Sequence, residues 1–124
     1  MMSPKKKILV IDDDEAVFGF LHIKIGYLYD LVTTTEPELA LDIAVSEAPD
    51  LILCDIDMPG KSGGDLAVEF LECDALRHIP FAYLTSFVSP QEVRDLRGNV
   101  GGRRGLAKTT QAPEMIQIIE QLLH

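Results

Sequence analysis

Hydrophobic and polar positions divide this chain into short apolar runs, each followed by acidic or turn residues and, in most cases, by apolar residues at helical spacing. The runs lie at residues 7–11, 31–34, 51–54, 81–84 and 106–107. Runs this short that are apolar on both faces are typical of strands buried on both sides of a parallel sheet. The helical repeats between them place Leu39, Leu71 and Leu96 among the side chains expected to face inward.

Five strands that alternate with five helices predict an α/β fold. We expect a flavodoxin-like, doubly wound sheet of five parallel strands in the order 2-1-3-4-5, with five helices. The chain has 124 residues, and residues 1–124 are expected to form a single domain with a polar lead-in at 1–6. Residues 98–105 contain four glycines and two arginines, which predict a flexible turn before the fifth strand.

Polar side chains follow four of the predicted strands at the edge where parallel strands end. They are Asp12, Asp13, Asp55, Asp57, Thr85 and Lys108. In the expected order these strands are neighbours, so their ends form one continuous rim. Carboxylates that lie close together repel one another unless a cation neutralises them, and oxygen ligands suit Mg²⁺. A carboxylate can act as a nucleophile that forms an aspartyl phosphate, with a hydroxyl and an ammonium to hold the phosphoryl oxygens.

Each of these residues has a plain structural explanation when it is considered alone. Asp12 and Asp13 could cap a helix, Thr85 could close a strand, and Lys108 could be a solvated surface lysine. The acids after the third strand could belong to an ordinary turn. Their joint occurrence at the ends of four different strands favours a site for phosphoryl chemistry.

Composition argues against several other classes of protein. Hydrophobic residues make up 47% of the chain, which argues against disorder. No apolar run approaches the ~18 residues of a membrane span, and the start lacks a signal-peptide pattern, so we expect the cytoplasm. The net charge of −9 disfavours direct binding to nucleic acid. Cys54 and Cys73 lack the spacing of metal ligands.

Four segments together resemble the response regulator receiver domain of two-component signal transduction. They are Val-Ile-Asp-Asp-Asp at 10–14, Leu-Cys-Asp-Ile-Asp-Met-Pro-Gly-Lys-Ser-Gly at 53–63, Leu-Thr-Ser at 84–86 and Leu-Ala-Lys at 106–108. The resemblance implies that Asp55 is the phosphoacceptor. It also implies an Mg²⁺ site with Asp13 as a direct ligand, Asp12 acting mostly through water, Asp55 itself, and the backbone carbonyl of Asp57.

The resemblance further implies roles for the other residues and for partners. Thr85 and Lys108 would contact the phosphoryl oxygens. The phosphodonor would be a histidine kinase or phosphotransfer protein, and a downstream protein would recognise the phosphorylated surface. Such a domain is not an enzyme beyond its own phosphorylation and dephosphorylation. A weak homodimer through the fourth and fifth helices is left open.

Three features depart from the pattern of the resembled family. That family usually has proline after the strand-five lysine, often with a cis bond, whereas Thr109 follows Lys108 here. A cis bond before a residue other than proline costs ~2.5–4 kcal/mol, so we expect a trans bond and a shifted path. The family usually has an aromatic residue three positions before that lysine, where this chain has Gly105. The third departure is the glycine-rich segment 98–105, which phosphorylation is expected to order or displace.

Two alternatives follow from the same residues. A receiver-like interaction module that does not accept phosphate would explain Gly105 and Thr109. A haloacid-dehalogenase-type phosphatase would explain the Asp55-Ile56-Asp57 motif, with the second acid as general acid–base. In that class, however, the motif normally lies on the first strand of a longer chain, and Asp12 would have no explanation.

Overall fold

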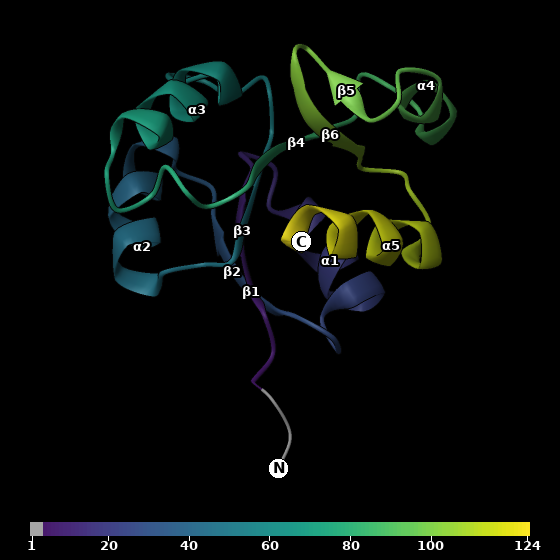
Figure 1. Ribbon diagram of the computed structural model, residues 1–124, viewed down its shortest axis with the longest axis horizontal. Coiled ribbons are helices and arrows are strands. Elements are labelled where there is room, and N and C mark those ends of the chain that lie inside the picture. The colour runs from purple at the N-terminus through teal and green to yellow at the C-terminus, as the bar shows by residue number, and fades with distance from the viewer. Residues whose placement is uncertain (1–3) are drawn as a thin grey trace.

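The computed structural model describes residues 4–124 of the chain. Within that range the sheet has six strands in the order β2-β1-β3-β4-β6-β5 (Figure 1). The strands are β1 (Lys7–Ile11), β2 (Asp30–Thr34), β3 (Leu51–Cys54), β4 (Phe81–Thr85), β5 (Asn99–Val100) and β6 (Arg103–Ala107). The helices are α1 (Ala16–Ile25), η1, a 3-10 turn (Pro37–Leu39), α2 (Ala40–Glu47), α3 (Gly63–Glu72), α4 (Pro90–Asp95) and α5 (Ala112–Leu123).

The five strands β2, β1, β3, β4 and β6 are paired in parallel, which confirms the predicted flavodoxin-like order. β6 takes the place of the predicted fifth strand. Helices α2 and α3 cover one face of the sheet, and α1 and α5 cover the other (Figure 1). Among the described helices, none is long and apolar enough to cross a lipid bilayer.

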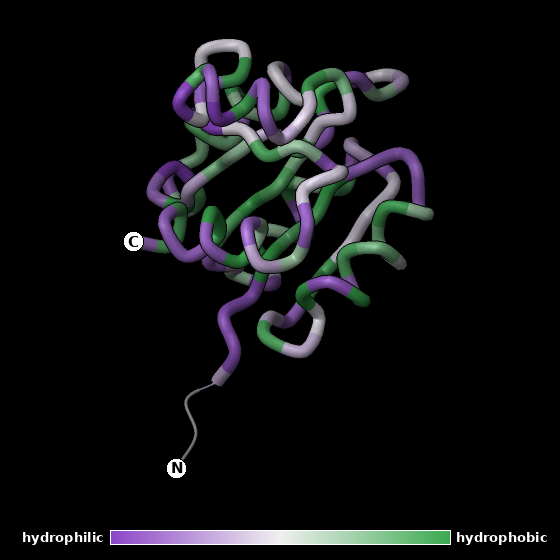
Figure 2. Tube along the Cα trace, turned by 90° about the vertical axis from the view of Figure 1, so that its right-hand side faces the viewer, coloured by the Kyte–Doolittle hydropathy of each residue, from purple (hydrophilic) through white to green (hydrophobic). Residues whose placement is uncertain are grey.

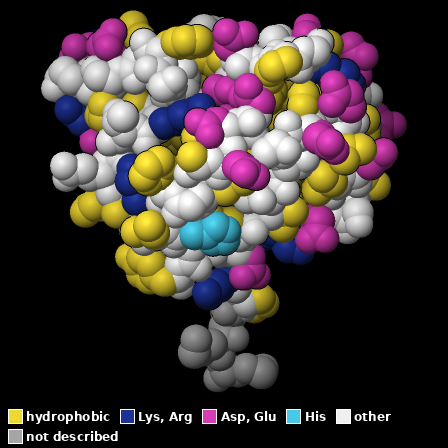
Figure 3. All heavy atoms as spheres, turned by 180° about the vertical axis from the view of Figure 1, so that it is seen from behind, with side chains coloured by type: hydrophobic (Ala, Val, Ile, Leu, Met, Phe, Trp, Pro, Cys, Tyr) yellow, Lys and Arg dark blue, Asp and Glu magenta, His cyan; other side chains and the backbone are white. Residues whose placement is uncertain are grey.

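Side chains along the central strands alternate between two apolar layers. In β3, Leu51 and Leu53 pack with residues of α1 and α5, whereas Ile52 and Cys54 pack with residues of α2 and α3. All four are fully buried, which confirms that this run is a strand covered on both faces. Figure 2 shows the hydrophobic positions gathered along the interior strands. Acidic side chains predominate on the face seen in Figure 3, as the net charge leads one to expect.

The prediction of a flexible turn at 98–105 is wrong, because β5 and the start of β6 form an antiparallel hairpin there. The two residues of its turn are Gly101 and Gly102, with φ of +58° and +83°. Two successive left-handed residues define a tight hairpin turn whose twist matches the strands on either side, and glycine adopts that conformation without a steric penalty. The glycines therefore build a defined turn.

Three of the side chains expected to face inward lie at the surface. Leu39, Leu71 and Leu96 are 45%, 53% and 51% exposed. Leu71 lies at the end of α3 and Leu96 directly follows α4, whereas Leu39 lies at the junction of η1 and α2. Helical spacing predicts an inner position for each of them, but at these helix termini the side chains are exposed to solvent.

Candidate functional site

Strand register brings the predicted site residues to one edge of the sheet. Ile11 pairs with Cys54, so Asp12 and Asp55 follow neighbouring strands at the same level, and the Asp55 amide donates to the carbonyl of Ile11 at 2.8 Å. On the other side, the Lys108 amide donates to the carbonyl of Thr85 at 2.8 Å. The predicted rim is therefore present.

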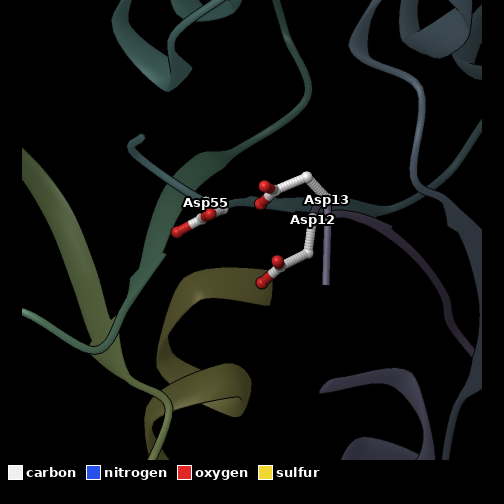
Figure 4. A group of neighbouring side chains, drawn as sticks. All are labelled: Asp12, Asp13 and Asp55. Atoms are coloured by element: carbon white, nitrogen blue, oxygen red, sulfur yellow. The ribbon is translucent and has the colours of Figure 1, made fainter. Parts of the chain in front are cut away.

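Three carboxylates form the acidic part of this rim. Asp12, Asp13 and Asp55 each place one oxygen so that all three oxygens lie within 4.8 Å of one another (Figure 4). Asp12 and Asp55 are buried, whereas Asp13 is exposed. Three oxygen ligands in one cluster match the preference of a hard divalent ion such as Mg²⁺. The donor set thus fits a metal site that is open to solvent on the Asp13 side.

The ammonium group of Lys108 lies between two of these acids. Its Nζ is 2.6 Å from Asp12 Oδ2 and 3.3 Å from Asp55 Oδ1. Apart from this ion pair, Asp12 Oδ2 has no hydrogen-bond partner among residues 4–124, although Asp12 is fully buried. A buried carboxylate oxygen held by one cation alone is unfavourable for stability, because desolvation is only partly offset. The cluster is therefore a candidate functional site.

The electrostatics of the cluster follow from burial and from like charges. Burial and the Asp12 carboxylate raise the pKa of Asp55 to about 6, while Lys108 acts in the opposite direction. Burial lowers the pKa of Lys108, but its hydrogen bond to Asp12 and its attraction to both acids outweigh burial and raise it. A cation added among the acids would offset the repulsion that raises the Asp55 pKa.

Local hydrogen bonds fix the loop that carries the first two acids. Asp12 Oδ1 accepts from the amide of Asp14, and Asp14 Oδ1 accepts from the amide of Ala16, each at 3.0 Å. The side chain that meets the start of α1 is therefore Asp14. Asp13 takes no part in these bonds, so its carboxylate is left to face the cluster in Figure 4.

The loop after β3 depends on Gly63, the last residue of the segment 53–63. The amide of Gly63 donates to the carbonyl of Ile56 at 2.7 Å, and a Cβ atom at this position would lie 2.4 Å from the carbonyl oxygen of Asp55. Only glycine permits this close approach of α3 to the loop. Asp57, which lies within the loop, is exposed.

Thr85 ends β4 next to Lys108. It is buried, and its Oγ1 accepts a hydrogen bond from the amide of Phe87 at 3.0 Å. That bond closes the strand end, which is the structural role expected of a threonine there. It uses the oxygen as an acceptor and leaves the hydroxyl proton available for donation.

Two residues that sequence reasoning missed hold the segment that carries Lys108. Lys24 Nζ donates to the carbonyls of Lys108 and Thr110 at 3.3 and 2.9 Å. Thr110 is buried, and its hydroxyl donates to the carbonyl of Ala107 at 2.6 Å. No cis peptide occurs within the described part of the chain, so the bond to Thr109 is trans, as expected. These contacts let Lys108 reach the acids with no proline after it.

Comparison with known proteins identifies the family of this chain. The model of the response regulator receiver domain matches residues 8–120. The chain belongs to that family. The polar-differentiation response regulator DivK of Brucella anthropi is 31% identical over 121 residues, which cover 95% of this chain and 96% of DivK. The response regulator PleD of Caulobacter vibrioides is 35% identical over 81 residues, 64% of this chain and 18% of PleD.

Solved structures support the same assignment. The BeF3-activated N-terminal receiver domain of Klebsiella pneumoniae RstA is 27% identical, with a TM-score of 0.73, over 96% of this chain and 99% of that one. The chemotaxis protein CheY4 of Vibrio cholerae, at 20% identity and a TM-score of 0.78 over 96% of this chain and 99% of that one, shows the fold alone. The chain is thus the receiver domain of a response regulator, and the dehalogenase-type alternative is not favoured.

Proposed function

We propose that this receiver domain accepts a phosphoryl group on Asp55 in an Mg²⁺-dependent reaction and then signals through a protein-binding surface. The observation that carries the proposal is the position of the Lys108 ammonium, within 3.3 Å of Asp55 and 2.6 Å of the fully buried Asp12. A cation beside a clustered carboxylate is suited to stabilise the charge that a phosphoryl group brings. The donor would be a phosphohistidine of a partner histidine kinase or phosphotransfer protein.

The transfer step would run as an in-line displacement at phosphorus. An oxygen of the Asp55 carboxylate attacks the phosphorus atom and forms a new P–O bond. The bond between phosphorus and the donor breaks, and its electron pair stays on the donor. With phosphohistidine the leaving group is an imidazole nitrogen, and with acetyl phosphate it is acetate.

The metal would be held by Asp12, Asp13 and Asp55, with the backbone carbonyl of Asp57 as a further ligand. A bound Mg²⁺ supplies positive charge that neutralises the carboxylates and the phosphoryl oxygens. The exposed position of Asp13 leaves the site open, so that waters and phosphoryl oxygens can complete the ligand shell.

Thr85 and Lys108 would hold the phosphoryl group after transfer. Thr85 already accepts a hydrogen bond from the amide of Phe87, and its own proton can be donated to a phosphoryl oxygen. Lys108 is half-buried and kept charged by the two acids. The chemistry would be limited to the domain's own phosphorylation and dephosphorylation.

Intact mass after incubation with acetyl phosphate and Mg²⁺ tests the proposal. We expect a gain of one phosphoryl mass, which is lost when EDTA removes the metal and in the Asp55→Asn variant. A folded protein with no gain in mass would contradict the proposal and favour the phosphate-independent interaction module. Steady turnover of a generic phosphate ester would instead favour a phosphatase.

A further inference from the structure

A pocket of about 290 Å³ lies away from the acidic site, where α4, β6 and α5 meet. Val93 of α4 packs with Tyr83 on one face of the sheet, whereas α5 packs with Leu84 on the other, so the two helices flank β6; Figure 1 shows α4 beside the hairpin. Three arginines line the pocket, although the chain as a whole carries a net charge of −9. They are Arg94, Arg97 and Arg104. A local concentration of guanidinium groups on an acidic protein calls for an explanation.

Among residues 4–124, one of these three guanidinium groups is neutralised by a neighbouring carboxylate. Arg94 Nη1 lies 2.7 Å from both carboxylate oxygens of Glu114, which also lines the pocket. Within residues 4–124, Arg97 and Arg104 form no ion pair with a carboxylate. The pocket therefore has two uncompensated positive charges, which favour a ligand of two negative charges.

Arg97, which lines the pocket, lies in the turn that ends α4. The amide of Gly98 donates to the carbonyl of Val93, and the amide of Arg97 donates to that of Arg94. These two bonds form the Schellman motif that ends a helix, and its left-handed position is usually glycine. Here that position is Arg97, with φ of +56°. A residue with a Cβ is disfavoured in this conformation, which Ala48 also adopts at the end of α2.

The remaining lining indicates the size and nature of the ligand. Val93 and Ile118 contribute apolar surface, and Gln117 and Gln121 contribute side-chain amides. A volume of about 290 Å³ is close to the lower end of the range for small-molecule sites. Apolar surface with a few amides suits a compact organic group, while the two free arginines suit a phosphate dianion.

We propose that this pocket binds a phosphate-bearing small molecule no larger than a nucleoside monophosphate. Arg97 and Arg104 bind the phosphate through their paired N–H donors, and Gln117 and Gln121 bind polar atoms of the organic group. Arg94 stays paired with Glu114 and closes one side of the pocket. The proposal is independent of phosphoryl transfer to Asp55.

Titration of the Asp55→Asn protein with pyrophosphate and with AMP, followed by amide NMR in EDTA, tests the proposal. We expect saturable shifts at residues of α4, β6 and α5 and none at residues 12, 13 and 55. Arg104→Gln should weaken binding by about tenfold or more, because a charge-assisted hydrogen bond is lost. Arg97→Gly should weaken it similarly and also raise the thermal midpoint, because glycine relieves the left-handed strain.

Arg103→Gln is the matched control, because Arg103 is the neighbouring arginine on β6 but lines a different pocket, with residues of α3. Its affinity should stay at the value of the parent protein. If neither pyrophosphate nor AMP binds saturably, the proposal is overturned. A loss of affinity in Arg103→Gln as large as that in Arg104→Gln would also overturn it. Saturation by a glutamate-rich peptide and by neither phosphate compound would also overturn it, and would assign this face to an acidic protein segment.

Discussion

The side chain of Val100 fills the space into which any side chain at Gly105 would project. A Cβ atom on Gly105 would lie 2.4 Å from Val100 Cγ2 and 2.6 Å from Val100 Cβ. Gly105 is buried and pairs with Tyr83 in the sheet, and Val100 and Tyr83 belong to the same apolar cluster. The hairpin thus supplies the apolar group that position 105 does not carry itself.

Gly105→Ala should lower the free energy of unfolding by about 1–3 kcal/mol, because the added methyl group overpacks the contact with Val100. Urea unfolding followed by circular dichroism measures the loss. In a Val100→Gly background the same substitution should cost clearly less, because the two positions are in contact. Equal costs in the two backgrounds would show that Val100 is not what excludes a side chain.

Gly63→Ala should also be destabilising, by about 1–3 kcal/mol, because its Cβ would meet the backbone of Asp55, which cannot move without shifting the loop. Gly64→Ala is the control, since a Cβ there would lie 3.6 Å from its nearest neighbours, an ordinary contact. Alanine in a helix is favoured over glycine, so this control should be at least as stable as the parent. Thermal melts of both variants provide the comparison, and similar losses would contradict the close-approach argument.

Lys24→Met should slow phosphorylation by acetyl phosphate about tenfold, because the segment that carries Lys108 loses its two hydrogen bonds and its precise position. The readout is the rate of mass gain. Lys7→Met is a matched control, since Lys7 Nζ likewise donates to a backbone carbonyl, that of Glu47, and Lys7 begins β1 at the end of the strand away from the site. If both variants slow the reaction equally, Lys24 has no positioning role.

The two thiols should differ in reactivity. Burial, together with the charges of Asp55 and Asp12, raises the pKa of the Cys54 thiol well above its ordinary value, so little thiolate forms at pH 8. Cys73 is half-buried. A disulfide reagent should therefore modify one thiol in the folded protein and two after denaturation. Cys73→Ser should abolish the native reaction, and a rapid native reaction in that variant would contradict the burial of Cys54.

The strands and their carboxyl ends could be predicted because each strand is a local signal. The run at 51–54 is apolar on both faces and is buried on both faces. Asp12, Asp55 and Lys108 were expected to converge because parallel strands end at one edge, and strand order alone sets their spacing. Local pattern and topology together were enough for this part of the site.

The parts that sequence reasoning missed depend on contacts between distant residues or on misjudged turn chemistry. The contacts of Lys24 with Lys108 and of Gly63 with Asp55 join residues on different elements, so no periodicity reports them. The hairpin did have a signal, since Gly101-Gly102 is a two-residue turn sequence. Its four glycines and two arginines were interpreted as flexibility instead.

Mapping the phosphoryl group along the chain shows directly whether Asp55 carries it. After incubation with acetyl phosphate and Mg²⁺, borohydride reduces an aspartyl phosphate to homoserine, which tandem mass spectrometry locates in the chain. We expect homoserine at position 55 alone, and none when the metal is withheld. Homoserine at Asp57 or Asp13, or at no position in a folded protein, would contradict this expectation.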